Sequence, residues 1–227
     1  MSSLLLSAGA VLYVKTTTPQ GQLSFDTDSP LWGRTVNPNN RELTAGGSSG
    51  GEAALIAMRG SILGLGTDMG GSVRIPAACC GIYGVKPTSR RIPRSGTETT
   101  EVPGSIYSGI AVACGPLACT MADCRWFLEI VADLQPWRYD AQISPYSFIP
   151  SKRAGKPLNI GLFTNNGISA PLPPVAAMFD EVAGALVAAG HNVDIITLPE
   201  FAPAFYAALG FMGLNGTDRL FVIASLL

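Results

Sequence analysis

The stretches GGSSGGEAALIA (residues 46–57) and TDMGGSVRIP (residues 67–76) each place a serine, Ser48 and Ser72, among glycines. A serine hydroxyl is a weak nucleophile until a base removes its proton, and that base is most often histidine. The chain contains a single histidine, His191, which lies far from both serines in the sequence. The two serine turns therefore raise the question of which other base could activate them.

A helix is predicted to begin directly after the first serine. Ser49 stands at the N-cap position and Glu52 follows three residues later, which is the spacing of a capping box. Ser48 then lies just before a helix N-terminus, where free backbone N–H groups and the helix dipole favour negative charge. The apolar stretch SILGLGTD (residues 61–68) is predicted to be a short buried strand that leads into the second serine turn.

Three functions are considered for these glycine-rich turns: phosphate binding, a nucleophile elbow and a two-serine relay with lysine. A phosphate loop of the form G-x-x-x-x-G-K-[ST] needs a lysine that neither turn contains, so nucleotide binding is not favoured. GGSSG matches the G-x-S-x-G nucleophile elbow, for which His191 and Asp194 are the candidate partners, but this short pattern recurs by chance. The third chemistry uses both serines: a desolvated, neutral lysine takes a proton, and one hydroxyl relays it to and from the other.

The glycines before Ser72 fit the third chemistry. Successive N–H groups in MGGS (residues 69–72) can converge on the oxygen that becomes negative when an acyl carbon is attacked. Glycine permits the backbone conformations that this convergence requires. The sequence therefore predicts an oxyanion hole beside the nucleophile.

The order and spacing of these residues resemble a known family. GGSSGGEAALIA followed by GLGTDMGGSVRIPAACCGIYGVKPT (residues 64–88) resembles the signature of the amidase signature family. TDSPLWGRTVNPNNRELTAGGSSGG (residues 27–51) is similar to the fungal acetamidase and fatty-acid amide hydrolase branch. The resemblance implies an α/β amidase-signature fold, a mixed and largely parallel sheet flanked by helices. It implies hydrolysis of a small-molecule carboxylic amide to a carboxylate and ammonia or an amine, with no metal or organic cofactor.

The resemblance also implies residue roles. Ser72 would be the nucleophile that forms the acyl-enzyme, and Ser48 the relay serine that the family holds in a cis peptide. For Ser49, Asp68 and Arg74, bracing of the loops without direct chemistry is expected. The implied substrate-binding and oxyanion groups are backbone atoms of Gln22, Met69, Gly70, Gly71 and Ser72, together with Ser48.

The family's catalytic lysine lies on a strand well upstream of the relay serine, farther than the 47 residues that precede Ser48. Lys15 and Lys86 align with other parts of the family pattern and do not inherit the role of base. The chain resembles the middle of an amidase, incomplete at both ends, and is expected to have little or no activity by itself. Two alternatives stay open: a non-catalytic remnant that binds amides or a protein partner, and a gene fragment without a stable fold.

Composition limits the classes of partner. The 227 residues carry 15 Lys and Arg and 16 Asp and Glu, and a net charge of -1 offers no basic surface for nucleic acid. Mean hydropathy is +0.30, yet the longest apolar runs fall short of the roughly 20 residues that span a bilayer, so no transmembrane segment is predicted. No basic segment precedes the N-terminal apolar run, so a signal peptide is not expected and a cytoplasmic location is the default. Exposed apolar surface and open strand edges would favour a homo-oligomer.

The chain is predicted to form one partial domain, residues 1–227, with its Gly-Ser-rich catalytic core at about 44–96. An exposed excursion or lid is predicted at about 135–156, where prolines replace periodic apolar positions. A strand–helix–strand unit with parallel strands is predicted at about 158–198. The five cysteines are odd in number and lack C-x-x-C spacing, which favours reduced, buried thiols over disulfides or a zinc site. They are Cys79, Cys80, Cys114, Cys119 and Cys124.

Overall fold

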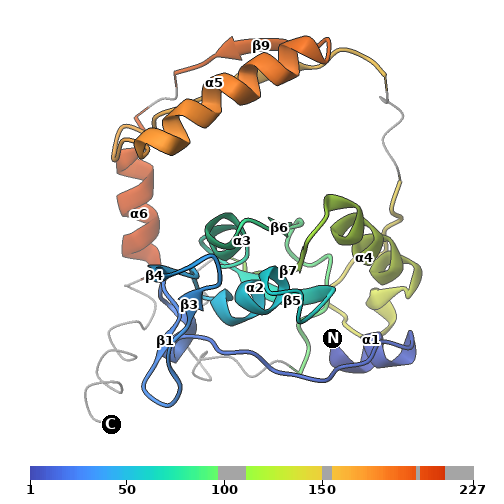
Figure 1. Cartoon of the computed structure of the whole chain (residues 1–227). Coiled ribbons are helices and arrows are strands. Elements are labelled where there is room, and N and C mark those ends of the chain that lie inside the picture. The colour runs from blue at the N-terminus through green and yellow to red at the C-terminus, as the bar shows by residue number, and fades with distance from the viewer. Residues whose placement is uncertain (97–110, 150–154, 198–199, 213–227) are drawn as a thin grey trace. The chain divides into compact units, whose positions relative to one another are not determined.

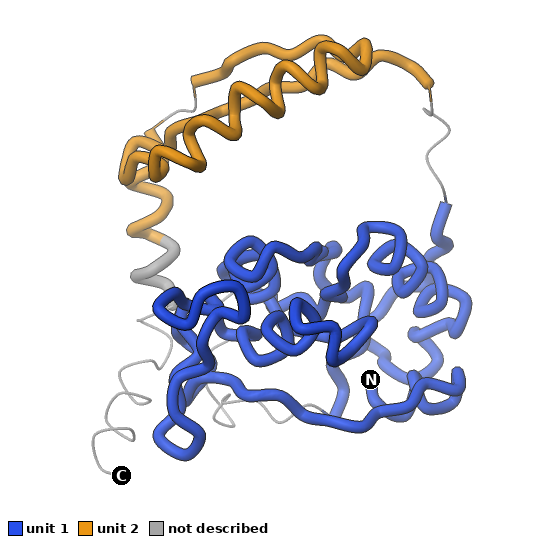
Figure 2. Tube along the Cα trace, viewed as in Figure 1, with its two compact units in different colours: residues 1–149 blue, residues 150–227 orange. Residues whose placement is uncertain are grey.

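A computed structural model describes residues 1–96, 111–149, 155–197 and 200–212 of the chain. The chain divides into two compact units, Met1–Ile149 and Pro150–Leu227 (Figure 2). Each unit is described by itself. The expectation that residues 1–227 form one domain stays a prediction.

The first unit carries most of the helices and strands (Figure 1). Its described elements are, in chain order, α1 (Ser2–Ser7), η1 (Gln20–Gln22), β1 (Asp28–Ser29), β2 (Gly33–Arg34), β3 (Val36–Asn37), β4 (Asn40–Thr44), α2 (Gly50–Ala57), β5 (Leu63–Asp68), α3 (Arg74–Cys80), β6 (Tyr83–Gly84), β7 (Ala113–Ala118), α4 (Met121–Asp133) and η2 (Pro136–Arg138).

The central sheet of this unit has the strand order β5-β7-β6. β7 lies in the middle, is buried along its whole length and runs antiparallel to both neighbours. β5 and β6 therefore run in the same direction, joined through α3, with the later strand β7 inserted between them. The α/β class is confirmed, but the expectation of largely parallel pairing was wrong for this sheet, because the insertion of β7 replaces a parallel contact with two antiparallel ones.

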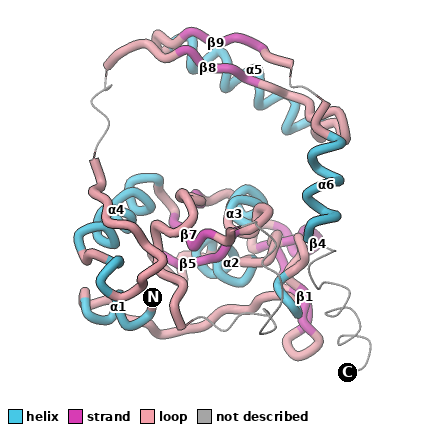
Figure 3. Tube along the Cα trace, turned by 180° about the vertical axis from the view of Figure 1, so that it is seen from behind, coloured by secondary structure: helices cyan, strands magenta, loops and turns pink. Residues whose placement is uncertain are grey.

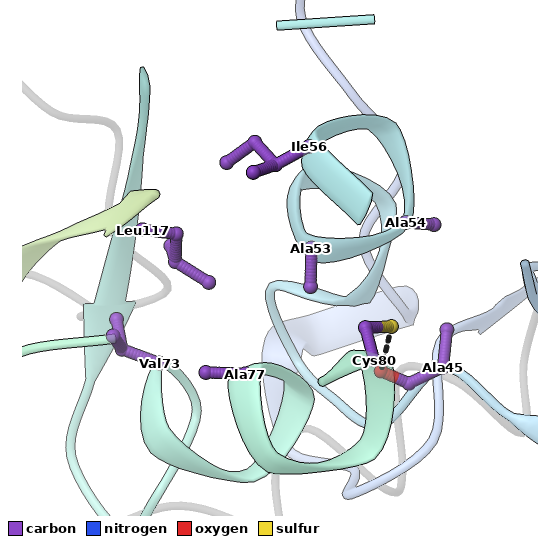
Figure 4. Packing of buried hydrophobic residues seen from close by; sticks show 8 residues of the cluster. All are labelled: Ala45, Ala53, Ala54, Ile56, Val73, Ala77, Cys80 and Leu117. Atoms are coloured by element: carbon purple, nitrogen blue, oxygen red, sulfur yellow. Dashed lines mark hydrogen bonds between the residues drawn. The ribbon is translucent and has the colours of Figure 1, made fainter. Parts of the chain in front are cut away.

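The first hydrophobic core lies between α2, α3 and the sheet (Figure 4). Ile56 of α2, Val73 before α3 and Leu117 of β7 are each 0 % exposed. Alanines such as Ala53 and Ala77 let the two helices approach closely, because small side chains leave room for neighbouring backbone. This packing fixes the two segments that carry Ser48 and Ser72 against one sheet.

A second core forms under α4. The stretch TMADCRWFLEIVADL (residues 120–134) predicts this helix, with Thr120 as N-cap and Phe127 and Val131 among its apolar positions. The N-cap is confirmed, since the Thr120 hydroxyl accepts a hydrogen bond from the backbone N–H of Asp123 at 3.1 Å. Phe127 and Val131 are buried, at 4 % and 0 % exposed, on the side that faces β7. The helical periodicity of the sequence therefore gave the correct buried face.

The described part of the predicted lid, residues 135–149, is tied to the first unit. The buried carboxylate of Asp140 accepts hydrogen bonds from the backbone N–H groups of Arg94 and Ser95, each at 3.1 Å. The Tyr146 hydroxyl donates to the Arg91 carbonyl oxygen at 2.8 Å. Residues 150–154 of the predicted lid lie outside the described residues, and the role of a lid stays a prediction.

The second unit contains the predicted strand–helix–strand unit. β8 (Asn159–Leu162) and β9 (Asn192–Ile195) pair in parallel, and α5 (Pro173–Ala188) connects them and runs alongside the pair (Figure 3). α6 (Ala202–Met212) follows. α5 begins at Pro173, and Gly190, with a positive φ of 86°, follows its C-terminal end. None of the helices described in either unit is long and apolar enough to cross a membrane.

Candidate active site

The structure brings the two predicted serine loops together. Ser48 lies in the loop before α2 and is 3 % exposed, while Ser72 lies between β5 and α3 and is partly exposed. The backbone N–H of Ser49 donates a hydrogen bond to the carbonyl oxygen of Ser72 at 3.2 Å. Segments that are separate in the sequence are thus joined directly beside both serines.

The peptide bond between Gly47 and Ser48 is cis, as the resemblance implies for the relay serine. Both residues are buried, and the loop continues directly into α2. The structure therefore gives Ser48 the backbone geometry expected for this position.

Asp68, at the end of β5, organises the loop that carries Ser72. Its carboxylate is 1 % exposed and accepts hydrogen bonds from the backbone N–H groups of Gly71 at 2.8 Å and Val73 at 3.1 Å. The Arg74 guanidinium adds two bonds, from Nε at 3.0 Å and from Nη2 at 2.9 Å, and the Arg74 backbone N–H adds a longer one at 3.3 Å. Asp68 and Arg74 therefore brace the loop that carries Ser72, and their supporting role in catalysis stays a prediction.

These contacts also determine the charge of the pair. Burial by itself raises the pKa of the Asp68 carboxyl, but the hydrogen bonds from Arg74 and from the Val73 amide outweigh it and hold the pKa below its usual range. The hydrogen bond to Asp68 raises the pKa of Arg74. Both groups are charged at neutral pH, so the loop is held by a permanent ion pair.

The four amides named for the oxyanion hole are not equivalent. The Gly71 N–H is engaged by the Asp68 carboxylate. Gly71 itself has a φ of 138°, a backbone conformation that residues other than glycine rarely adopt. Among the described residues, no acceptor is found for the amides of Met69, Gly70 and Ser72. Those three amides are the ones that could donate hydrogen bonds to an anionic oxygen.

The capping box predicted for α2 was wrong. Ser49 is the N-cap, but its side chain makes no capping hydrogen bond, because its backbone is not in the extended conformation that directs a cap hydroxyl at the first turn. The Glu52 carboxylate instead accepts a hydrogen bond from the Thr16 hydroxyl at 2.6 Å. Ser49 thus supports the site through its backbone bond to Ser72, while Glu52 ties α2 to the segment before it.

Gln22, Lys15 and Lys86 are all exposed. Gln22 ends η1 and has a positive φ of 59°. The Lys86 ammonium donates to the carbonyl oxygen of Pro87 at 3.2 Å. Among the described residues, no lysine forms a hydrogen bond with Ser48, and Gln22 forms none with either serine.

Reasoning from the sequence missed one residue of this site, Thr27. Its hydroxyl is buried against the loop of Ser48, where it donates to the Gly46 carbonyl at 2.8 Å and accepts from the Gly50 N–H at 3.1 Å. In the sequence it is an ordinary threonine in a polar stretch, and no spacing rule links it to residues so far along the chain. Only the folded chain identifies it.

In the described ranges, no group of three or more His, Cys, Asp or Glu side chains is placed to hold a metal ion. Two hollows of the first unit lie elsewhere, one against Arg94 and Asp140 and the other against Arg91 and Tyr146. The sulfur atoms of Cys80, Cys114 and Cys124 are buried, and those of Cys79 and Cys119 are partly so.

Comparisons with known proteins agree with this geometry. A sequence model of the Amidase family matches residues 2–216. The chain is 40 % identical over 201 residues to an acetamidase of Aspergillus oryzae, covering 85 % of this chain and 36 % of that protein. It is 40 % identical over 217 residues to fatty-acid amide hydrolase 1 of Sus scrofa, covering 93 % of this chain and 36 % of that protein. The solved structure of a fatty acid amide hydrolase superposes with a TM-score of 0.88 at 29 % identity, over 96 % of this chain and 38 % of that one. The chain thus spans little more than a third of the length of these relatives.

Proposed function

Because this chain belongs to the amidase family, we propose that it carries the nucleophile and the relay serine of an amide hydrolase. Ser72 is the nucleophile and Ser48 the relay. The substrate is a small-molecule carboxylic amide, and the products are a carboxylate and ammonia or an amine. No cofactor is assigned to the reaction.

The proposed reaction has two halves. The Ser72 oxygen bonds to the amide carbon while its proton passes to Ser48, the carbon–nitrogen bond breaks, and the leaving nitrogen receives a proton through the same relay. Water then attacks the acyl-enzyme, the ester bond to Ser72 breaks, a proton of the water returns to the Ser72 oxygen through the relay, and the carboxylate leaves. In both halves the negative oxygen binds to the amides of Met69, Gly70 and Ser72, and one such donor is worth on the order of 10²-fold to 10³-fold in turnover.

The observation that carries this proposal is the hydrogen bond from the Ser49 N–H to the Ser72 carbonyl oxygen at 3.2 Å. It couples the two serine loops at the residues next to both hydroxyls, in a site where Ser48 is 3 % exposed. A backbone bond that holds the two loops together supports a proton relay, because proton transfer requires the two hydroxyls to come within hydrogen-bond reach.

A base is still required to take the proton from Ser48. The proposed base is a lysine, and none of the lysines in the described residues forms a hydrogen bond with Ser48. The 227-residue chain by itself is therefore proposed to turn over amides poorly. In serine hydrolases, removal of the base from the catalytic unit costs on the order of 10⁶-fold in turnover.

The test combines covalent labelling with turnover. A fluorescent fluorophosphonate forms a bond from phosphorus to the serine oxygen while the P–F bond breaks, fluoride leaves and the hydroxyl proton is given up. We expect the modified peptide to contain Ser72, with no modification in Ser72→Ala and unchanged modification in Ser61→Ala, whose serine lies outside both loops. Hydrolysis of short-chain, aryl and fatty-acyl amides should be slow in the same sample.

Equal labelling of Ser72→Ala, or a folded chain that takes up no probe, would overturn the assignment of the nucleophile. Rapid hydrolysis that Ser72→Ala removes would support the nucleophile and overturn the proposed need for a further base.

A further inference from the structure

Thr27 is the most completely buried hydroxyl beside the candidate site, with 0 % of the residue exposed. It lies in the segment before β1, well separated in sequence from the loop of Ser48. Buried hydroxyls are costly unless their donor and acceptor are both satisfied, so the partners of this group indicate what it holds.

Those partners lie on both sides of Ser48. The hydroxyl donates to the Gly46 carbonyl at 2.8 Å, two residues before Ser48, and accepts from the Gly50 N–H at 3.1 Å, two residues after it. The Ser48 carbonyl lies at 3.4 Å and is a longer alternative acceptor. One side chain thus connects the entry and the exit of the turn that presents Ser48.

Thr27 is itself fixed by its neighbours. Its carbonyl oxygen accepts from the Thr35 N–H at 2.8 Å, and its N–H donates to the Asp26 carboxylate at 3.0 Å. Asp26 is held in turn by Arg34 at 2.9 Å and by the hydroxyl of Thr44. The hydroxyl therefore projects from a rigid segment.

The same segment touches the loop on a second side. A methyl group placed on Gly47 would lie 2.7 Å from the carbonyl oxygen of Ser24 and 3.0 Å from the backbone of Asp26. Backbone of residues 24–26 is therefore packed directly on the residue before Ser48. The backbone of residues 24–26 packs on Gly47, and the Thr27 hydroxyl bridges Gly46 and Gly50. These contacts together restrict movement of the turn that contains Ser48.

We infer that Thr27 is a positioning residue, which sets the place of the Ser48 hydroxyl relative to Ser72 through the ends of the turn. The inference rests on the proposed function, because it assigns Thr27 a purpose in the relay of the Ser72 proton. Thr27 touches neither the substrate nor the reacting atoms. Its effect is on the rate of the chemical step, since a displacement of about 1 Å in a catalytic group can cost on the order of 10²-fold.

The test compares three variants of the 227-residue chain. Thr27→Val keeps the shape and removes the hydroxyl, Thr27→Ser keeps the hydroxyl, and Thr17→Val is the matched control. Thr17 is a partly buried threonine whose hydroxyl pairs with that of Thr35 at 2.6 Å; it packs against Gly51 of α2 but forms no hydrogen bond with the Ser48 turn. Thermal melts establish which variants are folded before any rate is compared.

The first measurement is the rate of fluorophosphonate modification of Ser72 as a function of probe concentration. We expect Thr27→Val to lower the limiting rate by at least about tenfold at unchanged apparent affinity, and Thr27→Ser and Thr17→Val to stay within about threefold of the parent. A purely structural loss would lower the melting temperature of Thr27→Val and Thr27→Ser alike and would not be rescued by the retained hydroxyl.

The second measurement is hydrogen–deuterium exchange of the Gly50 amide, which does not depend on reactivity. Thr27→Val should exchange at least about tenfold faster there, and Thr27→Ser should not. Unchanged exchange in Thr27→Val would overturn the bridge itself, and an unchanged labelling rate would overturn the positioning role. If the parent chain takes up no probe while exchange responds as expected, the proposed function fails and the positioning role fails with it, although the hydroxyl bridge stands.

Discussion

Asp68 and Arg74 form an ion pair in which the carboxylate side chain is 1 % exposed and the guanidinium side chain is 52 % exposed. Two hydrogen bonds at 2.9 and 3.0 Å join them, one to each carboxylate oxygen. The Asp68 carboxylate also accepts hydrogen bonds from the amides of Gly71 and Val73. Asp68 therefore links the exposed Arg74 guanidinium to the backbone on both sides of Ser72.

Removal of the Arg74 guanidinium should loosen the loop that carries Ser72. Arg74→Ala leaves the Asp68 charge buried with backbone donors alone, and hydrogen bonds to charged groups contribute about 1.5–3 kcal/mol each. We expect a fall of about that size in the free energy of unfolding and slower fluorophosphonate labelling of Ser72. Arg74→Lys should recover part of the loss, because lysine restores the charge without the fork of two donors. Denaturant unfolding measures the change, and an Arg74→Ala chain as stable as the parent would contradict the bracing role.

Acid should destabilise the chain through Asp68. Because its pKa is lowered by folding, its stabilising contribution is present above the ordinary carboxyl pKa, about 3.9, and is lost as the pH falls through the lower folded value. The free energy of unfolding should therefore decline as the pH drops below about 4, and the decline should be shallower in Asp68→Asn. The exposed Asp28→Asn is the control. An acid limb of equal slope in Asp68→Asn and the parent would refute the linkage.

Gly47 should not tolerate a side chain. In Gly47→Ala the new methyl group would meet the carbonyl oxygen of Ser24 at 2.7 Å, and backbone atoms cannot move aside as a flexible side chain can. We expect a loss of about 1–3 kcal/mol in the free energy of unfolding, typical of overpacking, together with a loss of Ser72 labelling. Gly184→Ala is the contrast, because open space surrounds Gly184 in α5, and alanine there should stabilise the helix by about 1 kcal/mol. Comparable melts and labelling for Gly47→Ala and the parent would show that the loop has more room than the structure gives it.

The N-cap of α4 should be measurable separately from the site. Thr120→Ala removes the acceptor of the Asp123 N–H at 3.1 Å, and loss of such a cap costs about 1 kcal/mol. Thr120→Ser should keep most of the stability, because serine caps equally well. Denaturant midpoints of the two variants test this, and equal midpoints for alanine and serine would disprove the cap's contribution.

Two buried thiols should resist alkylation. Burial raises the pKa of Cys80 and of Cys124 to about 11. At pH 8 the folded chain therefore holds roughly a hundredfold less thiolate at these positions than the unfolded chain, and thiolate is the reactive form. Iodoacetamide followed by peptide mass spectrometry should modify both cysteines slowly in buffer and rapidly in urea. Fast modification of either one in buffer would show that its site is open to solvent.

Much of the local structure could be predicted. The start of α4 at Thr120, its buried positions Phe127 and Val131, and the parallel strands around α5 follow from neighbours within a few residues, because caps, helical periodicity and glycine or proline signals are local. The capping box at Ser49 and Glu52 failed for the opposite reason. A hydroxyl distant in the sequence, that of Thr16, competes for the Glu52 carboxylate.

The sequence by itself determined where the two glycine-flanked serines lie, the family and the α/β class. These depend on the order and spacing of glycines, serines and apolar residues. The tertiary structure alone decided three features. They are the antiparallel insertion of β7, the hydrogen bond from the Gly71 amide to Asp68, and the hydrogen bonds of the Thr27 hydroxyl at both ends of the Ser48 turn. The first depends on which strands meet in the sheet. The other two depend on hydrogen bonds whose partners are chosen by three-dimensional approach, since a buried donor or acceptor pairs with whichever group packing brings within about 3 Å.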